Sequence, residues 1–423
     1  MALLLGAIAD DITGATDLAL MLSRSGMRTI QVMGVPSDTS AFADADAVVV
    51  ALKSRTNPVD EAVRWSLRAC DVLSAAGAEQ IFFKYCSTFD STDEGNIGPV
   101  ADALMQTLGA DAAFVCPAFP ANGRSVYKGH LFVGDTLLSD SPMKDHPLTP
   151  MRDANLVRVM ARQSDRPVVL VDAATVSAGA DAVRTAIAAT ADQGPRFVVA
   201  DAIDDAHLMT LGAAAAGHRL ITGGSGIALG LADNFEAAGK LTKTPPPETI
   251  TGAAGRAAIL AGSCSVATRG QVAHAIEDGV PARKLDPAKV VSGETSAADL
   301  IDWAANQPAD APVLIYSSDS PDAVGQAQAA LGRDASGAAI ERLLADVAGG
   351  LAGHGFTRMI VAGGETSGAV ADGLGVSAIE IGPEIDPGVP WVKSRDGRDL
   401  LLAFKSGNFG TEDFFTKAWS RIS

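Results

Sequence analysis

The sequence predicts an α/β protein of two domains, each with a mostly parallel sheet flanked by helices. Short apolar or β-branched runs alternate with stretches of helical spacing along nearly the whole chain. The length of 423 residues exceeds one ordinary domain. A Pro-rich segment of low apolar content interrupts the alternation and predicts a linker at 241–250, with domains at 1–240 and 251–423.

The composition narrows the class of ligand. Hydrophobic residues make up 47% of the chain, enough for sizeable cores, and the formal net charge is −17 at pH 7. Because no basic stripe offsets this charge, we expect no nucleic acid and no membrane as partner. The four cysteines show no CxxC spacing, which predicts reduced thiols without structural zinc. With no signal-peptide or membrane-span pattern, we expect a cytoplasmic protein that binds small molecules.

The first apolar run ends in two adjacent carboxylates, Asp10 and Asp11. In open α/β sheets ligands bind beyond the carboxyl ends of the strands, so the pair is well placed to meet a substrate. Neighbours in an extended segment point to opposite sides, so we expect one carboxylate to face the ligand and the other to cap or orient. A purely structural N-cap and turn role is the alternative.

A cationic segment follows the third predicted strand. Helical spacing at 15–25 and strand-like runs at 29–33 and 47–52 come after the carboxylates. The last run ends in Lys53, Ser54, Arg55 and Thr56, where Arg55 could hold a carboxylate by a two-point fork. A solvated loop that carries these charges by chance is the alternative.

A polar cluster follows the fourth predicted strand, 80–85, which comes after a helix expected at 60–76. Lys84 and Asp90 stand there among several hydroxyl side chains, which indicates a second candidate site. Glycines at the start of the next helix would leave N–H groups that could hold an anion. Loop and cap chemistry is the alternative for this segment.

The remaining elements continue the alternation. After a strand at 113–116, Asn122 and Arg124 are expected in a loop shaped by Pro and Gly, and the three prolines of 133–151 predict a long loop. Strands are expected at 168–172, 197–200, 257–261, 312–317 and 358–362 and before Lys405, with a helical region at 336–354. A glycine turn at 223–226 could cradle an anion or close a tight crossing.

Three strand-to-helix turns of small residues mark the second domain. They hold Ser263 and Ser265, then Gly363, Gly364, Glu365 and Thr366 before a helix expected from Ser367, and finally Gly407 and Gly410. Backbone N–H groups and hydroxyls in such turns bind phosphate. Because packing alone hardly accounts for three of them, they predict a nucleotide-binding domain, although the Lys of a Walker A loop is absent.

With these motifs the chain resembles the four-carbon acid sugar kinase family, most closely its 3-oxo-tetronate kinase branch. The resemblance runs nearly end to end and rests on IADDITGATDLA, LKSRT, FKYCSTFDSTDEGNIGPV, CPAFPANGR, GDTLLSDSPMKDHPLTPM, AGSCSVATRGQ, VAGGETSG and KSGNFG. It implies an N-terminal acid-sugar domain, a C-terminal ATP domain and an active site in the cleft between them. It also implies phosphoryl transfer to the terminal hydroxyl, which would give 3-oxo-tetronate 4-phosphate.

The resemblance and the chemistry together assign expected roles. The resemblance implies ATP contacts from Ser265, from the Gly363 to Thr366 turn and from Gly407 or Gly410, with Ser263 beside them. From the chemistry we expect Arg55, helped by Lys53 or Lys84, to hold the substrate carboxylate, and Asp10, Asp11 and Asp90 to bind hydroxyls, with Asn122 and Arg124 also at the substrate. Phosphoryl transfer rests on positioning and charge stabilisation, so ATP and Mg²⁺ are the expected cofactors, with the metal ligands left open. Asp11 is favoured as the group that orients or accepts the hydroxyl proton, with Asp10 and Asp90 as alternatives.

Competing functions remain. A threonate or erythronate kinase is the alternative within the family. A non-catalytic acid-sugar sensor would keep the N-terminal cluster but has no need of three phosphate turns. A nicotinamide oxidoreductase would need a G-x-G-x-x-G pattern after a strand, which is not found. An acid sugar and ATP are therefore the expected small-molecule partners, and the sequence leaves a homo-oligomer open.

Overall fold

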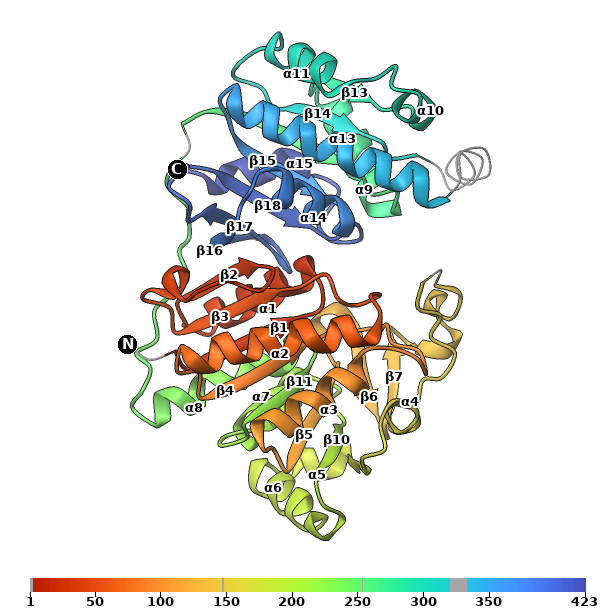
Figure 1. Ribbon diagram of the computed structural model, residues 1–423, viewed down its shortest axis with the longest axis vertical. Coiled ribbons are helices and arrows are strands. Elements are labelled where there is room, and N and C mark those ends of the chain that lie inside the picture. Colours follow the sequence, from red (N-terminus) through yellow and green to blue (C-terminus); the bar gives the residue numbers. More distant parts are fainter. Residues whose placement is uncertain (1–2, 147, 253, 320–332) are drawn as a thin grey trace. The chain divides into compact units, whose positions relative to one another are not determined.

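The computed structural model describes residues 3–146, 148–252, 254–319 and 333–423 (Figure 1). The chain divides into two compact units, Met1–Pro245 and Pro246–Ser423, so the division falls inside the Pro-rich segment. Each unit has a sheet flanked by helices. The expectation of an α/β protein built from two such parts is confirmed.

The described part of the first unit contains a parallel sheet of eight strands in the order β2-β3-β1-β4-β11-β5-β10-β9. The strands are β1 (Leu5–Ala9), β2 (Thr29–Met33), β3 (Ala47–Ala51), β4 (Gln80–Lys84), β5 (Ala112–Cys116), β9 (Val168–Val171), β10 (Arg196–Ala200) and β11 (Leu220–Gly223). The central ones are apolar runs buried along their whole length, as parallel strands covered by helices on both faces must be.

The helices of this unit run in two directions along the sheet. They are α1 (Ile12–Arg24), α2 (Val59–Ala75), α3 (Ile97–Leu108), α4 (Leu156–Gln163), α5 (Ala173–Ser177), α6 (Ala180–Ala188), α7 (Asp205–Ala214) and α8 (Leu231–Ala237). The β1-α1-β2 crossover runs opposite to β3-α2-β4 and β4-α3-β5, and because crossovers are right-handed, α1 covers the other face from α2 and α3. The direction therefore reverses between β1 and β4, the place where open α/β sheets bind ligands.

A small antiparallel sheet lies where the sequence predicts loops. It consists of β6 (Arg124–Tyr127), β7 (His130–Val133) and β8 (Thr136–Leu137). The expectation of loops across this segment is therefore wrong. The strands are only two to four residues long, and glycines with positive φ, Gly129 at 71° and Gly134 at 62°, join them. Such short strands with mixed polarity leave no period-2 pattern to detect.

The second unit has a mixed sheet, in its described part of the order β13-β14-β12-β15-β18-β17-β16. The strands are β12 (Arg256–Ala261), β13 (Ala282–Lys284), β14 (Val313–Tyr316), β15 (Phe356–Ala362), β16 (Ala378–Asp386), β17 (Val389–Ser394) and β18 (Leu401–Lys405). Pairing is parallel from β13 to β18, and β17 is antiparallel to both β18 and β16. After β12 the chain crosses to β13 at one edge of this sheet, and after β15 it crosses to β16 in the other direction. A second reversal point therefore lies between β12 and β15.

The helices of the second unit are α9 (Val266–Glu277), α10 (Pro287–Val291), α11 (Ala297–Ala305), α13 (Arg333–Gly353), α14 (Gly364–Gly373) and α15 (Phe414–Lys417). Helix α14 starts three residues before the expected Ser367, and α1 starts at Ile12 instead of residue 15. Gly363, directly after β15, is the N-cap of α14, and Asp11, two residues after β1, is the N-cap of α1, so both helices begin almost at once after their strands.

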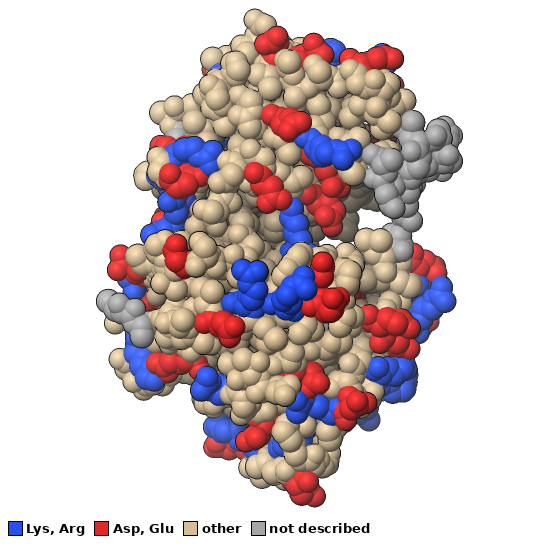
Figure 2. Space-filling view, in the orientation of Figure 1, with Lys and Arg blue, Asp and Glu red and all other residues tan. Residues whose placement is uncertain are grey.

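The surface carries charges of both signs. On the face shown in Figure 2, Lys and Arg side chains are interspersed with Asp and Glu. Across the described ranges, none of the helices combines the length and the apolar character that crossing a bilayer requires.

Candidate functional site

Asp10 and Asp11 follow β1 at the reversal point of the first unit and have different surroundings. Asp11 is the N-cap of α1 and accepts hydrogen bonds from Gly14 N at 3.1 Å and Thr13 Oγ1 at 2.8 Å. A Cβ at Gly14 would lie 2.2 Å from Asp11 Oδ1, so glycine is needed there. Asp10 is buried and has no capping role, because its carboxylate points to β3. Asp11 is therefore the capping member of the pair, and the ligand-facing role of Asp10 stays a prediction.

Arg55 gathers the carboxylates of this edge. Its Nε donates to Asp10 Oδ2 at 2.9 Å and its Nη2 to Asp10 Oδ1 at 2.8 Å. The same Nη2 donates to Asp11 Oδ1 at 2.7 Å, and Nη1 lies 3.6 Å from Asp90 Oδ2. We call Asp10, Asp11, Asp90 and Arg55 the Arg55 cluster. The structure thus joins predicted site residues from the ends of three strands.

The two adjacent carboxylates differ in acidity. Burial raises the pKa of Asp10 above its ordinary value and outweighs the opposing charge of Arg55. Burial would raise the pKa of Asp11 too, but the charges of Arg55 and Lys84 and the hydrogen bond from Thr13 hold it below its ordinary value. Pairs of carboxyl groups whose surroundings separate their pKa values in this way suit acid and base roles.

The segment after β4 is strained where it meets the cluster. Phe89 and Asp90 are consecutive non-glycine residues with positive φ, 67° and 49°. The buried Phe89 ring packs edge-to-face on Tyr85 with centroids 5.4 Å apart, and Thr88 Oγ1 donates to Asp90 Oδ1 at 2.7 Å. Left-handed backbone at such residues costs on the order of 1–3 kcal/mol each and is retained mainly at functional sites. The strain thus supports a functional role for Asp90.

Two side-chain amides, for which the sequence predicted no contacts, hold the segments around the Arg55 cluster in place. Asn96 Nδ2 donates to the main-chain oxygens of Ser54 at 2.8 Å and Asn57 at 2.9 Å, which fixes the loop that carries Arg55. Gln163 Oε1 accepts from Gly98 N at 2.8 Å, in the first turn of α3. The N–H group of Gly98, which the sequence suggested for an anion, therefore already has a protein acceptor. Both amides lie far along the chain from their partners, so no local pattern reveals them.

The other predicted substrate residues lie in different surroundings. Lys84 is buried and its Nζ donates to Tyr85 O at 2.7 Å, while Lys53 is exposed after β3. The guanidinium of Arg124 donates to the main-chain oxygen of Asn122. Within the described residues, neither Asn122 nor Arg124 forms a hydrogen bond or ion pair with the Arg55 cluster. The charge of Lys84 thus acts on Asp11 of the cluster, whereas Arg124 contacts Asn122.

In the second unit the three small-residue turns meet at the reversal point. Ser265 is the N-cap of α9, and its Oγ also donates to Gly407 O at 2.5 Å. Gly363 N donates to Lys405 O at 2.8 Å, and Ser263 N donates to Ala362 O at 3.1 Å. A Cβ at Gly407 would lie 2.3 Å from Ser263 Oγ. Segments far apart in sequence therefore form one surface of small residues.

Helix α14 presents its N-terminus without a side-chain cap. Gly363, with a φ of 129°, occupies the N-cap position. The Thr366 hydroxyl lies against glycine backbone, since a Cβ at Gly262 would be 2.1 Å from Thr366 Oγ1. Among the described residues, this hydroxyl has no hydrogen-bond partner, and Glu365 beside it is exposed. Free N–H groups at a helix N-terminus attract phosphate.

Lys405, at the end of β18, is fully buried without a carboxylate partner in the described part of the chain. Its Nζ lies 3.0 Å from Gly407 O, and 3.1 Å from Ser406 O, Phe409 O and Thr268 Oγ1. Burial lowers the pKa of Lys405 to about 7. The ammonium group thus holds together the turn that contains Gly407 and Gly410.

Comparison with known proteins places both units. A family model described as a sugar-binding N-terminal domain matches residues 5–231, and one described as a nucleotide-binding C-terminal domain matches 258–415. The 3-oxo-tetronate kinases of Cupriavidus necator and Burkholderia multivorans are 54% and 53% identical to the chain. These matches cover 99% and 98% of this chain and 97% and 96% of the relatives.

Solved structures agree with this placement. A Salmonella typhimurium LT2 protein superposes with a TM-score of 0.89 at 43% identity, over 98% of each chain. A Haemophilus influenzae protein of family DUF1537 superposes with a TM-score of 0.81 at 44% identity, over 98% of this chain and 99% of its own. With both domain models matched and relatives this similar over nearly their full length, the chain belongs to the four-carbon acid sugar kinase family, alongside the 3-oxo-tetronate kinases, and is a sugar-acid kinase.

Proposed function

We propose that this kinase transfers the γ-phosphoryl group of ATP to the terminal, 4-hydroxyl of 3-oxo-tetronate, forming 3-oxo-tetronate 4-phosphate. The Arg55 cluster carries the proposal, because it assembles three carboxylates at the reversal point of a sugar-binding domain. Carboxylates of this kind hold sugar hydroxyls by strong hydrogen bonds and can take a hydroxyl proton during transfer.

The proton acceptor is assigned to Asp10 on the basis of its surroundings. The sequence favours Asp11 for this role, but in the structure Asp11 caps α1 and its pKa is lowered. Asp10 has the raised pKa and hence the greater affinity for a proton of the two carboxylates. In this proposal Asp11 and Asp90 bind hydroxyls, while Arg55 keeps all three carboxylates aligned.

The nucleotide is assigned to the three turns of the second unit. The uncapped amides of α14, in the Gly363 to Thr366 turn, would hold phosphate oxygens. Ser265 and Ser263 contact Gly407, and Gly410 belongs to the same turn as Gly407, so these residues are assigned to the nucleotide as well. These residues match the nucleotide-binding role of the family model that spans them.

Mg²⁺ fits the same surface. A hard divalent cation takes oxygen ligands, and in kinases most of these come from the nucleotide itself. The exposed Glu365 carboxylate offers a protein oxygen beside the phosphate turn, and so does the Thr366 hydroxyl, which has no hydrogen-bond partner within the described ranges. When bound, the ion would neutralise charge on the transferred group, and the chain's own contribution is to align the nucleotide.

The proposal is tested by a coupled ADP-release assay with Mg-ATP and a panel of 3-oxo-tetronates, threonate and erythronate. Turnover that depends on a 3-oxo acid, with the phosphate located on the terminal carbon by NMR, supports it. Turnover only with threonate or erythronate keeps the kinase and changes the substrate. No turnover with any of these acids by a folded protein that still binds them would favour a sensor.

A further inference from the structure

The turn after β18 has its carbonyl oxygens tied to side chains of the second unit. It comprises residues 406–411, and we call it the β18 turn. The oxygens that accept a side-chain hydrogen bond are those of Ser406, Gly407, Phe409, Gly410 and Thr411. The donors are Lys405, at the end of β18, and polar side chains that α9 or its N-cap supplies. The main chain of this turn therefore has a fixed orientation.

Gln271 of α9 holds the second half of the β18 turn, although the sequence predicted no role for it. Its side chain is fully buried, and Nε2 lies 3.0 Å from each of the main-chain oxygens of Phe409, Gly410 and Thr411. The Oε1 atom of the same amide is buried and has no hydrogen-bond partner among the described residues. A buried polar atom without a partner is costly, so the contribution of this amide lies in its N–H donors.

Lys405 holds the first half of the β18 turn. Its buried Nζ lies 3.0 Å from Gly407 O and 3.1 Å from both Ser406 O and Phe409 O. The Thr268 hydroxyl of α9 also donates to Gly407 O, at 2.8 Å. Because Phe409 O contacts both the ammonium group and the α9 amide, the two side chains act on adjoining parts of one turn.

The N–H groups of Gly407, Asn408 and Gly410 face the opposite way. Each belongs to a peptide whose oxygen contacts Lys405 or Gln271, and in a planar trans peptide the N–H points away from the C=O. Within the described ranges, none of these three N–H groups has an acceptor, and the residues are exposed or half-buried. We call them the outward N–H groups. Main-chain N–H groups that point to one side bind anions.

The β18 turn lies next to the uncapped start of α14. Gly363 N donates to Lys405 O at 2.8 Å, directly before the turn. Ser263 lies between the two segments, because a Cβ at Gly407 would be 2.3 Å from Ser263 Oγ and one at Gly363 would be 3.2 Å from Ser263 N. Two neighbouring sets of main-chain donors suit a ligand that carries more than one phosphate group.

We propose that Gln271 and Lys405 are positioning residues for the nucleotide. By holding the carbonyl oxygens of the β18 turn inward, they direct the outward N–H groups at the phosphates of ATP. The inference rests on the proposed function, and it adds Gln271 and the N–H group of Asn408 to the residues that serve the nucleotide. A peptide without its donor is free to rotate, and a carbonyl oxygen turned outward repels a phosphate.

Calorimetric titration of the full chain with Mg-ATP, without acid sugar, compares Gln271→Met with the wild type. Methionine is close to glutamine in size and has no N–H donor. Hydrogen bonds to charged groups are strong, so the Kd for Mg-ATP should rise about 10- to 100-fold. In the coupled assay the KM for ATP should rise with it, while the KM for the acid sugar stays at the wild-type value.

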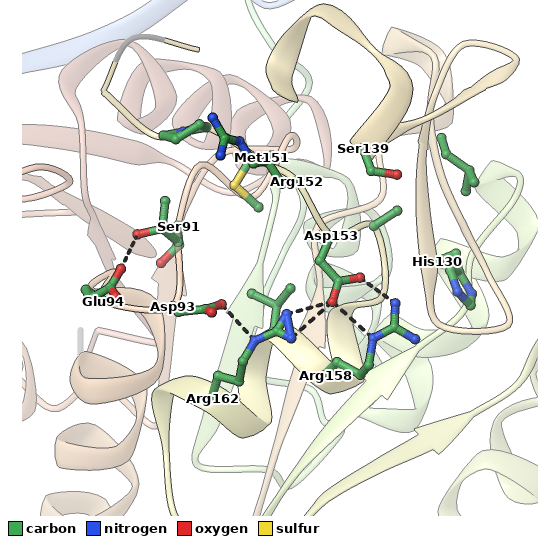
Figure 3. Close-up of a pocket in the computed structure, with 15 residues that line it drawn as sticks. Ser91, Asp93, Glu94, His130, Ser139, Met151, Arg152, Asp153, Arg158 and Arg162 are labelled. Atoms are coloured by element: carbon green, nitrogen blue, oxygen red, sulfur yellow. Dashed lines mark hydrogen bonds and ion pairs between the residues drawn. The ribbon is translucent and has the colours of Figure 1, made fainter. Parts of the chain in front are cut away.

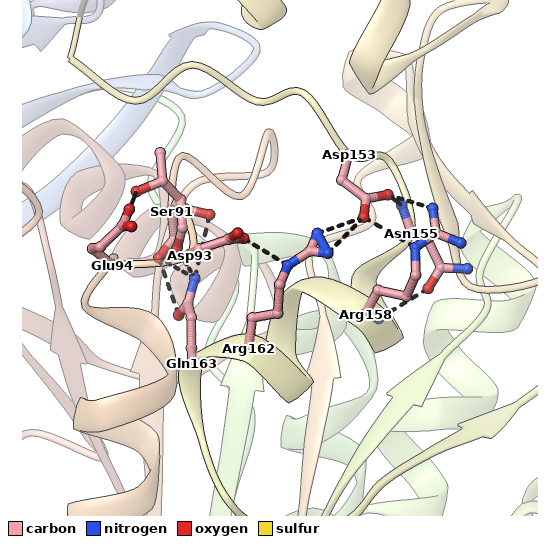
Figure 4. Close-up of polar contacts among 9 residues, drawn as sticks. Ser91, Asp93, Glu94, Asp153, Asn155, Arg158, Arg162 and Gln163 are labelled. Carbon is pink, nitrogen blue, oxygen red and sulfur yellow. Dashed lines mark hydrogen bonds and ion pairs between the residues drawn. The ribbon is translucent and has the colours of Figure 1, made fainter.

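Gln163→Met is the matched control, because it removes a similar set of contacts from the first unit. Gln163 Nε2 donates to Ser91 Oγ at 3.0 Å and to the main-chain oxygens of Ser91 and Thr92, two residues that line a cavity of about 810 Å³ (Figure 3, Figure 4). This variant should keep the wild-type Kd for Mg-ATP even if its unfolding midpoint falls as far as that of Gln271→Met. An equal loss of ATP affinity in both variants would contradict the assigned role.

Hydrogen–deuterium exchange of the full chain adds a readout that stability alone does not change. Mg-ATP should slow the exchange of residues 406–411 in the wild type, and this slowing should be lost in Gln271→Met. Slowed exchange without turnover of any acid keeps the inference and rejects the proposed substrate. Turnover of a 3-oxo acid with unchanged exchange in 406–411 rejects the inference alone. An unchanged Kd in Gln271→Met, or no binding of Mg-ATP to the wild type, would also overturn it.

Discussion

The guanidinium of Arg55 lies against the carboxylate of Asp10 in a two-point fork, with contacts of 2.9 and 2.8 Å. The two residues follow adjacent parallel strands, β3 and β1, in which Ala51 pairs with Ala9. The main chain reinforces this register, because Ser54 N donates to Asp10 O at 2.9 Å. The fork is thus a consequence of the sheet, and it sets the charge of the residue assigned as proton acceptor.

Arg55→Lys should move the acid limb of activity to higher pH. Lysine keeps the positive charge but loses the fork, and Arg55 lowers the pKa of Asp10 by charge and by hydrogen bonding. The already raised pKa of Asp10 should therefore rise further in the variant. Profiles of kcat/KM between pH 5 and 9 measure the shift, and an acid limb identical to that of wild type would remove Asp10 from the role of base.

Arg55→Ala tests the carboxylate role that the sequence assigned to this residue. If Arg55 binds the substrate carboxylate directly, the KM for the acid sugar rises strongly and the KM for ATP changes little. If Arg55 aligns Asp10, Asp11 and Asp90 instead, kcat falls as well, because the reacting hydroxyl loses its partners. An unchanged KM for the acid sugar refutes the carboxylate role.

Asp11→Asn separates capping from charge. Asn caps helices about as well as Asp, so the variant should unfold at nearly the wild-type midpoint, whereas Asp11→Ala should lose about 1 kcal/mol of stability. Both variants should lower kcat, since both remove a carboxylate from the Arg55 cluster. Thermal unfolding and initial rates measure the two effects. Full activity in Asp11→Asn would leave Asp11 with a structural role only.

The strand-end residues could be predicted from the sequence because parallel strands end at a common edge. Each of the residues Asp10, Arg55 and Asp90 follows an apolar run. The pattern that predicts the strands therefore also predicts that these three side chains lie at one edge of the sheet. Which of two adjacent carboxylates caps the helix depends on the start of α1, and a periodicity does not define a helix start to one residue. Contacts between distant segments, such as Arg162 of α4 with Asp93 after β4, leave no local pattern in the sequence.

Asn96→Ala should loosen the loop that carries Arg55. The variant removes a donor from the buried main-chain oxygen of Ser54 and from the partly buried ones of Arg55 and Asn57, and a buried group left unsatisfied costs about 1–3 kcal/mol. We expect a lower unfolding midpoint and a higher KM for the acid sugar. As a matched control, Asn306→Ala removes an exposed amide whose donor reaches only Asp302 O within its own helix. Equal effects of the two variants would contradict the assigned role of Asn96.

Lys405→Met should change how stability depends on pH. The folded chain releases the Lys405 proton near pH 7, whereas an unfolded lysine keeps its proton to about pH 10.4. Between these values the unfolded state binds more protons, so Lys405 makes the free energy of unfolding rise with pH, and below pH 7 its full cost is present. Methionine fills the space without a charge and should abolish this rise, which is on the order of a few kcal/mol. It should also weaken ATP binding, because the carbonyls of Ser406, Gly407 and Phe409 lose their donor. Urea unfolding at several values between pH 7 and 9.5 measures the slope, with the exposed Lys289→Met as control. Parallel curves for wild type and Lys405→Met would show that this ammonium group does not titrate in the folded chain.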